Sequence, residues 1–151
     1  MENELGFDIA DTAQAVRRAF DRRASALGTT RAQWRVLARL ARADGQRQID
    51  LADSLDVEPI TLCRMIDRLT EAGLVERRSD PLDRRARRVH LTAKAEPVVE
   101  SLRGLADTFF AEALSGVGED EQERLRDALR RIRDNLTDGG RSAAPAKGIK
   151  A

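Results

Sequence analysis

Residues 80–92 read DPLDRRARRVHLT and are the most informative stretch of this chain. The Asp-Pro turn at its start separates two short runs, Leu74–Arg78 and Arg87–Leu91, whose composition predicts β-strands joined as a hairpin. From Arg77 to His90 the sequence carries six arginines and two aspartates, a local charge of +4 in a chain whose net charge is +1. The hairpin is therefore predicted to present a concentrated positive charge.

A cationic hairpin of this kind suits duplex DNA. Arginines at its tip can enter a narrow minor groove, where the negative potential is strongest, and arginines on its strands can meet phosphates and release counterions. We expect Asp80 and Asp83 to pair with arginines and fix the shape of the tip, which leaves Arg84 and Arg85 outward. An arginine-rich loop that is simply solvated is the alternative.

Just before the hairpin, the sequence predicts a helix-turn-helix. A short helix over Ile49–Leu55 is followed by a turn at Asp56 and Val57, and Pro59 suits the first turn of a second helix that stops at Gly73. The apolar side of this second helix carries Leu62, Met65, Ile66 and Leu69. The opposite side carries Ile60, Arg64, Asp67, Arg68 and Glu71, with Thr61 and Cys63 at the margins. A helix of this width fits the major groove of DNA; the alternative is an ordinary solvated helix surface.

Amphipathic helices are predicted before and after the helix-turn-helix and the hairpin. Apolar residues recur at helical spacing from Leu5 to Leu27, which predicts an N-terminal helix. Thr30 is expected to cap the helix that follows it, and Thr92 is expected to cap a long helix after the hairpin. We therefore predict a mainly α fold, a winged helix-turn-helix with a small β-hairpin wing, flanked by N- and C-terminal dimerisation helices. The predicted parts are an N-terminal dimerisation helix (1–29), a DNA-binding domain (30–92), C-terminal dimerisation helices (93–138) and a disordered tail (139–151).

Composition excludes several classes of function. One cysteine, Cys63, and one histidine, His90, leave no internal disulfide and no usual metal centre, so we predict no metal and no cofactor. The sequence has no glycine-rich phosphate loop and no nucleophile-elbow motif, which argues against an enzyme. It also lacks a membrane-length apolar stretch and a signal peptide, so we expect a cytoplasmic protein with no membrane partner. A redox role for Cys63 stays open, and His90 is expected to be structural.

The stretch at 80–92 resembles the wing of the MarR family of bacterial transcriptional regulators. Residues 62–69, LCRMIDRL, followed by EAGLV at 71–75, are similar to the recognition helix of that family. The stretches TRAQWRVL at 30–37 and KAEP at 94–97 resemble its SlyA branch. The wing motif is specific, whereas a helix-turn-helix alone would not be. The resemblance extends over nearly the whole chain apart from the tail.

The resemblance implies a homodimeric regulator, expected to be a repressor, that binds double-stranded DNA at a pseudo-palindromic operator. By position, Thr61 and Arg64 match family residues that face the major groove. Arg84 and Arg85 match the wing-tip arginines that enter the minor groove, and Asp83 matches the acid that orients them. Further DNA-contact candidates are Arg68, Arg87 and Arg88, with internal pairing as the alternative for the last two.

Many members of the family respond to small aromatic carboxylates or phenols, and the SlyA branch to salicylate-type ligands. Such ligands bind between the dimerisation and DNA-binding parts, and Arg17 and Trp34 are the candidates here for lining that crevice. The alternative is that Trp34 belongs to the core and Arg17 to the surface. A second hypothesis for the whole chain is a non-enzymatic nucleic-acid or protein interaction module without a small-molecule effector.

Overall fold

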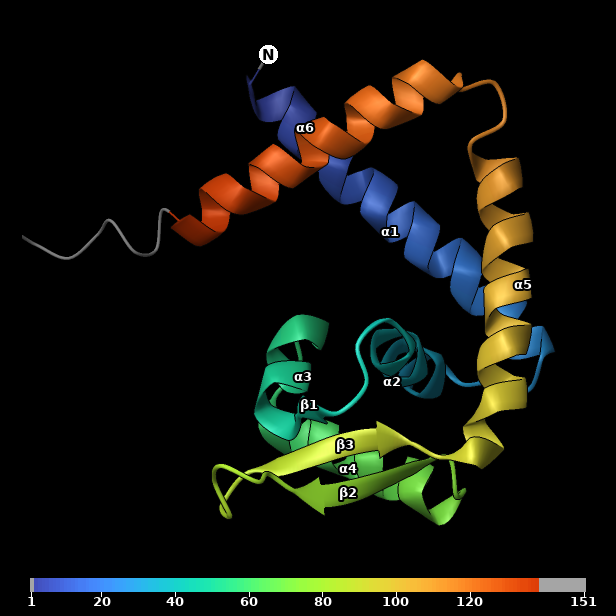
Figure 1. Ribbon diagram of the computed structural model, residues 1–151. Helices are drawn as coiled ribbons and strands as arrows, with labels where there is room; N and C mark the ends of the chain where they lie inside the picture. The colour runs from blue at the N-terminus through green and yellow to red at the C-terminus, as the bar shows by residue number, and fades with distance from the viewer. Residues whose placement is uncertain (1, 139–151) are drawn as a thin grey trace, which may run out of the picture. The chain divides into compact units, whose positions relative to one another are not determined.

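The computed structural model describes residues 2–138 and confirms a mainly helical chain with one small sheet (Figure 1). The elements are α1 (Glu2–Ala26), α2 (Arg31–Arg42), β1 (Gln46–Arg47), α3 (Gln48–Leu55), α4 (Pro59–Glu71), β2 (Val75–Ser79), β3 (Arg87–Leu91), α5 (Glu96–Ala113) and α6 (Glu119–Asp138). The chain divides into two compact units, Met1–Ala111 and Glu112–Ala151. The predicted tail at 139–151 lies outside the described residues.

Local signals explain where the helices of the first unit begin and end. Thr30 and Gln33 form a capping box at the start of α2, each side chain accepting a hydrogen bond from the backbone N–H of the other. Asp56 adopts a left-handed conformation, with φ of 52°, that ends α3 and turns the chain. Pro59 then occupies the first turn of α4. The predicted helix-turn-helix is therefore confirmed.

The buried face of α4 decides which side of that helix is left exposed. Leu62, Ile66 and Leu69 are all 0% exposed and belong to the same core cluster as Leu37 of α2 and Val89 of β3. Burying each such side chain contributes about 1.5–3 kcal/mol relative to leaving it in water. The apolar stripe thus fixes the rotation of α4 and directs its polar face outward.

Three strands form one antiparallel sheet in the part of the chain that is described, in the order β1-β3-β2. The hairpin of β2 and β3 is the predicted wing, but β1 was missed because two residues give no readable alternation. Gly45, just before β1, has φ of +70°, and a Cβ there would lie 2.7 Å from Cε1 of His90. His90 thus packs against the backbone, in line with its expected structural role.

The predicted cap at Thr92 is wrong. Its side chain makes no capping bond, and a single 3-10 turn at Ala93–Ala95 comes before α5. The Thr92 hydroxyl instead donates to the carbonyl oxygen of Gly73 at 2.5 Å. That bond ties the end of β3 to the loop before β2, so the hydroxyl is not available to cap a helix.

The second unit contains α6, whose polar and apolar residues lie on different faces. The apolar stripe consists of Leu125, Leu129, Ile132 and Leu136 at helical spacing. Leu125 is 49% and Leu136 is 75% exposed, and no residue from 119 to 137 is buried within the chain. In the first unit, the start of α1 likewise exposes Leu5 and Phe7, by 59% and 68%.

Candidate nucleic-acid interface

The outward face of α4 carries the residues that the sequence predicted for the major groove. Thr61, Arg64 and Arg68 are all exposed, and Ile60 is exposed at the first turn of the same helix. Neither arginine side chain forms an ion pair with any residue of the described chain. Their positive charge is therefore available to a ligand outside this chain.

Arg77 does not belong to that exposed charge. Arg77 belongs to β2, and its Nη2 lies 2.7 Å from Oδ1 of Asp67 on α4. The same nitrogen donates to the carbonyl oxygen of Cys63 at 3.2 Å. Its Nε donates to Oε1 of Gln48 on α3 at 3.0 Å. One guanidinium therefore connects the sheet to both helices of the helix-turn-helix. Cys63 is half-buried, and its Sγ lies 3.7 Å from Nη2 of Arg77.

Asp80, at the base of the wing, is the centre of a buried ionic cluster. Its side chain is 0% exposed, and its Oδ2 accepts hydrogen bonds from Nε of Arg47 at 2.8 Å and from Nε of Arg88 at 3.1 Å. Its Oδ1 accepts from the backbone N–H of Leu82 at 2.9 Å. The Leu82 bond, with help from the two arginines, lowers the pKa of Asp80 despite its burial. Arg88 is thus paired internally, the alternative foreseen for it.

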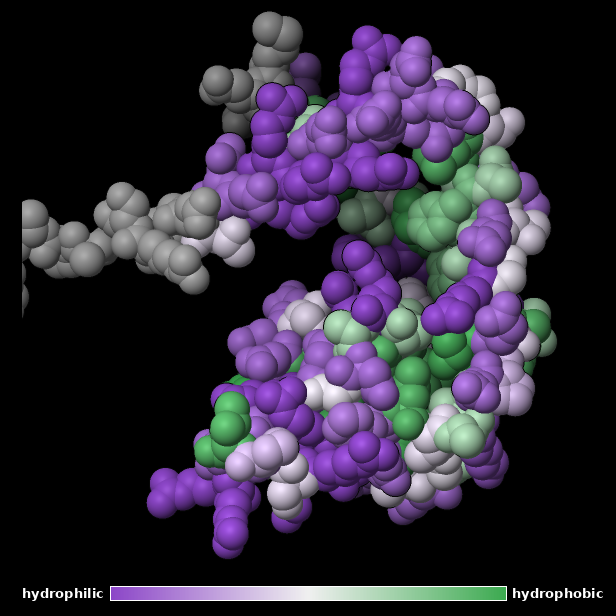
Figure 2. Space-filling view, in the orientation of Figure 1, coloured by the Kyte–Doolittle hydropathy of each residue, from purple (hydrophilic) through white to green (hydrophobic). Residues whose placement is uncertain are grey.

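The tip of the wing is shaped by Asp83 in a way that the sequence did not predict. Asp83 pairs with no arginine among the described residues; its Oδ1 accepts from the backbone N–H of Arg85 at 3.0 Å. It therefore orders the backbone of the turn and not a guanidinium, because an aspartate two residues earlier is well placed for an Asx turn. Hydrophilic side chains project from this tip in Figure 2.

Arg84 and Arg85 are both exposed, and neither forms an ion pair within residues 2–138. Arg87, also exposed, donates to the hydroxyl of Ser79 at 3.1 Å. The local charge of +4 nevertheless overestimates the unpaired positive charge of the wing, because Arg77, Arg78 and Arg88 are each paired with a carboxylate. Two of those carboxylates, Asp67 and Glu76, stand outside the stretch that was counted. The effective positive charge is concentrated at the tip.

The two residues proposed for ligand binding, Arg17 and Trp34, line one cavity of about 430 Å³. Its other lining residues are Val16, Phe20, Leu37, Ala38, Ala41, Arg42, Val99, Leu102, Arg103, Ala106 and Phe110. Trp34 packs edge-on against Phe20, with ring centroids 4.7 Å apart, and its Nε1 donates to Oδ1 of Asp21 at 2.8 Å. Trp34 therefore contacts the core and the cavity at once. Figure 2 shows hydrophobic side chains at the surface between α2 and α5.

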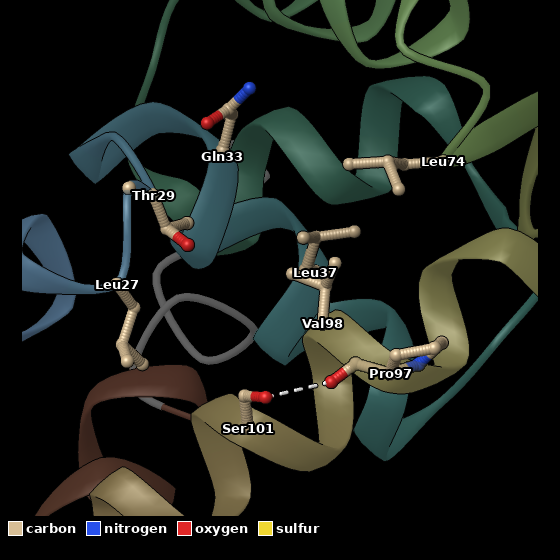
Figure 3. A pocket seen from close by; sticks show the side chains of 9 residues that line it. Leu27, Thr29, Gln33, Leu37, Leu74, Pro97, Val98 and Ser101 are labelled. Atoms are coloured by element: carbon tan, nitrogen blue, oxygen red, sulfur yellow. Dashed lines mark hydrogen bonds between the residues drawn. The ribbon is translucent and has the colours of Figure 1, made fainter.

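A second cavity, of about 350 Å³, lies between the turn after α1 and the start of α5 (Figure 3). Leu37 lines both cavities. In the second cavity the hydroxyl of Ser101 donates to the carbonyl oxygen of Pro97 at 2.9 Å, so that group is already satisfied. None of the residues that line it is charged. The cavity of Trp34, with Arg17, Arg42 and Arg103 on its wall, is the better candidate for an anionic ligand.

Within residues 2–138 no group of three or more His, Cys, Asp and Glu side chains is arranged to hold a metal ion. The same part of the chain contains no helix that is both long and apolar enough to cross a membrane.

Comparisons with known proteins agree with this geometry. The model of the MarR family matches residues 29–86. The solved structure of the transcriptional regulator PA3341 is 39% identical, with a TM-score of 0.82 over 89% of this chain and 98% of that one. A MarR transcriptional regulator from Methanosarcina mazei Go1 is 25% identical, with a TM-score of 0.78 over 90% and 98% of the two chains.

A third solved structure is a mutant MarR from E. coli in complex with operator DNA. It is 30% identical to this chain, with a TM-score of 0.72 over 85% of this chain and 93% of that one. These likenesses extend well beyond the helix-turn-helix to the flanking helices. The chain belongs to the MarR family of transcriptional regulators.

Proposed function

We propose that this protein binds a pseudo-palindromic operator as a homodimer and represses transcription there, without catalytic activity of its own. The observation that carries the proposal is that the same chain has exposed arginines on the outward face of α4 and at the tip of the wing. The stretches at 30–37 and 94–97 favour a place near the SlyA branch of the family. Arg77 and Arg88 of the wing support its structure, because each is paired with a carboxylate.

In this proposal α4 lies in the major groove. Arg64, in its second turn, reaches guanine O6 and N7 or a phosphate, and Thr61 offers its hydroxyl to phosphate or its methyl to thymine. Arg68, one turn after Arg64, meets the DNA backbone. Arg77 supports this arrangement from behind, because it holds α4 against β2.

The wing meets the neighbouring minor groove in the same complex. Arg84 and Arg85 insert where the groove is narrow, and Asp83 keeps the turn in shape by its bond to the backbone of Arg85. Arg87, exposed at the start of β3, contacts phosphate. Arg88 contributes indirectly, because its bond to Asp80 fixes the base of the wing.

The homodimer is proposed from the helices at the two ends of the chain. A helix with a continuous apolar stripe, such as Leu125 to Leu136 of α6, needs a surface on which to bury it, and no residue from 119 to 137 is buried within one chain. Leu5 and Phe7 of α1 present a second exposed apolar area. A second copy of the chain is the partner that also gives the two-fold symmetry of an operator, with recognition helices about 34 Å apart.

The cavity of Trp34 favours a regulatory ligand as a second element of the proposal. Its wall is mostly apolar with three arginines, which is the lining that a small aromatic carboxylate or phenol requires. Arg17 and Arg42 form no ion pair with any described residue, so their charge is available to a carboxylate. We propose that such a ligand releases the protein from DNA.

Selection of binding sites from a pool of random duplexes tests the DNA-binding proposal. The full chain is expected to enrich two inverted half-sites whose centres lie about 10 base pairs apart, one helical turn. An equal affinity for enriched and random duplexes would contradict sequence-specific binding. Enrichment of single-stranded RNA in a parallel selection would favour the alternative of a different nucleic-acid module.

A further inference from the structure

Ile60 is an apolar side chain on the face of α4 that the core does not use. Leu62, Ile66 and Leu69 are 0% exposed on the opposite face, whereas Ile60 is 64% exposed. On a helix, residues four apart share a face, so Ile60 stands in line with Arg64. Single exposed apolar residues are common on protein surfaces, so the exposure of Ile60 does not by itself indicate a binding role.

The position of Ile60 separates it from an ordinary surface residue. It lies next to Pro59, which lines a groove of about 390 Å³ together with Ile49 of α3 and Arg85 of the wing. Ile49 is itself 62% exposed. The N-terminal turn of α4 therefore presents apolar surface beside the wing, and this turn is the part of a recognition helix that approaches the base edges.

The edges of the bases in the major groove carry one apolar group, the C5-methyl of thymine, which adenine, guanine and cytosine lack. Resting on the proposed function, we propose that Ile60 determines specificity by packing against a thymine methyl in each half-site. Neighbouring side chains on one helix face have Cβ atoms about 5–6 Å apart, and base pairs follow every ~3.4 Å. The thymine read by Ile60 is therefore one or two base pairs from the base or phosphate contacted by Arg64.

Uracil tests this contact, because it pairs like thymine and differs from it in the major groove only by the missing methyl. The duplex enriched by the wild-type chain is resynthesised with each thymine replaced by uracil in turn, and binding of the full chain is measured by fluorescence anisotropy. Removal of one buried methyl is expected to weaken binding about fourfold, and removal from both half-sites about 15-fold. The loss that depends on Ile60 is expected at one thymine position per half-site.

Ile60→Ala identifies the side chain responsible. Its affinity for the thymine duplex is expected to fall, and its thymine-to-uracil affinity ratio at that position is expected to fall to about one, because the two changes remove the same contact. The variant should fold normally, since Ile60 is exposed and alanine is the best helix former. Leu27→Ala removes a side chain of similar exposure, 50%, away from α4 and should keep the wild-type ratio.

Two results would overturn the inference while leaving the proposed function intact. One is a wild-type chain that binds the enriched duplex and its uracil forms equally at every thymine. The other is an Ile60→Ala variant that retains the full thymine-to-uracil ratio. Failure of the wild-type chain to enrich any duplex would instead overturn the proposed function, and this inference with it.

Discussion

Nε of Arg47 lies 2.8 Å from Oδ2 of Asp80, although 33 positions separate the two residues in sequence. Arg47 belongs to β1 and Asp80 to the base of the wing, and Arg88 of β3 reaches the same oxygen. The carboxylate that joins them is 0% exposed. The wing is therefore held at its base by a buried ionic cluster, while Arg84 and Arg85 at its tip remain exposed.

Asp80→Asn should make the protein less stable at neutral pH. The folded protein lowers the pKa of Asp80, so the unfolded chain binds a proton more readily, and the stabilisation is present above the ordinary aspartate pKa of ~3.9. It is lost as the pH falls through that value toward the lower pKa of the folded state. Urea unfolding of both proteins between pH 7 and pH 3 should show the stability difference shrinking, and a constant difference would contradict the role of the charge.

Arg64→Ala should weaken binding to the enriched operator by about 1–3 kcal/mol and reduce the preference at one base pair. Arg68→Ala provides the comparison, because a phosphate contact is lost equally on every sequence. Titrations against the operator and against single-base variants of it distinguish the two. If Arg64→Ala loses the same affinity on all duplexes, Arg64 contacts phosphate and does not read a base.

Ile132→Glu should convert a dimer into a monomer, because it places a charge in the apolar stripe of α6. Sedimentation at micromolar concentration measures the change directly. Arg131→Glu introduces the same side chain at an exposed position outside the stripe and should remain dimeric. A wild-type chain that sediments as a stable monomer would remove the basis for a symmetric operator.

A ligand in the cavity of Trp34 should change the fluorescence of the protein, since this is the one tryptophan of the chain. Salicylate is a suitable probe, and Arg17→Ala should weaken its binding about tenfold or more, the typical loss of a charge-assisted hydrogen bond. Arg18→Ala removes an exposed arginine that does not line the cavity and should bind as the wild type does. Equal affinity in all three proteins would place the ligand elsewhere.

Most of the fold was readable from the sequence because its signals are local. Gly, Pro and capping residues mark the helix ends, and the stripe from Leu62 to Leu69 fixes the rotation of α4. The strand at Gln46–Arg47 escaped detection because its pairing with β3 is a long-range contact with no local signal.

For the same reason, a count of charges along the stretch from Arg77 to His90 overestimates the free charge of the wing. Arg77 pairs with Asp67 on α4, and Arg78 pairs with Glu76 on the same strand, β2. Local charge counting sees residues of one stretch, whereas ion pairs depend on which elements pack together. The exposure of Arg84 and Arg85 at the tip could be predicted because a hairpin turn exposes its residues, and their contact with DNA stays a prediction.

The salt dependence of operator binding tests the account most directly. Each phosphate charge neutralised on B-DNA contributes about 0.9 to the slope of log affinity against log salt. Replacing both Arg84 and Arg85 with alanine should weaken binding and reduce that slope by up to about two units. Arg78→Ala is the control and should leave the slope unchanged, because Arg78 is already paired with Glu76. A double variant with the wild-type slope and affinity would contradict the proposal that the tip of the wing binds DNA.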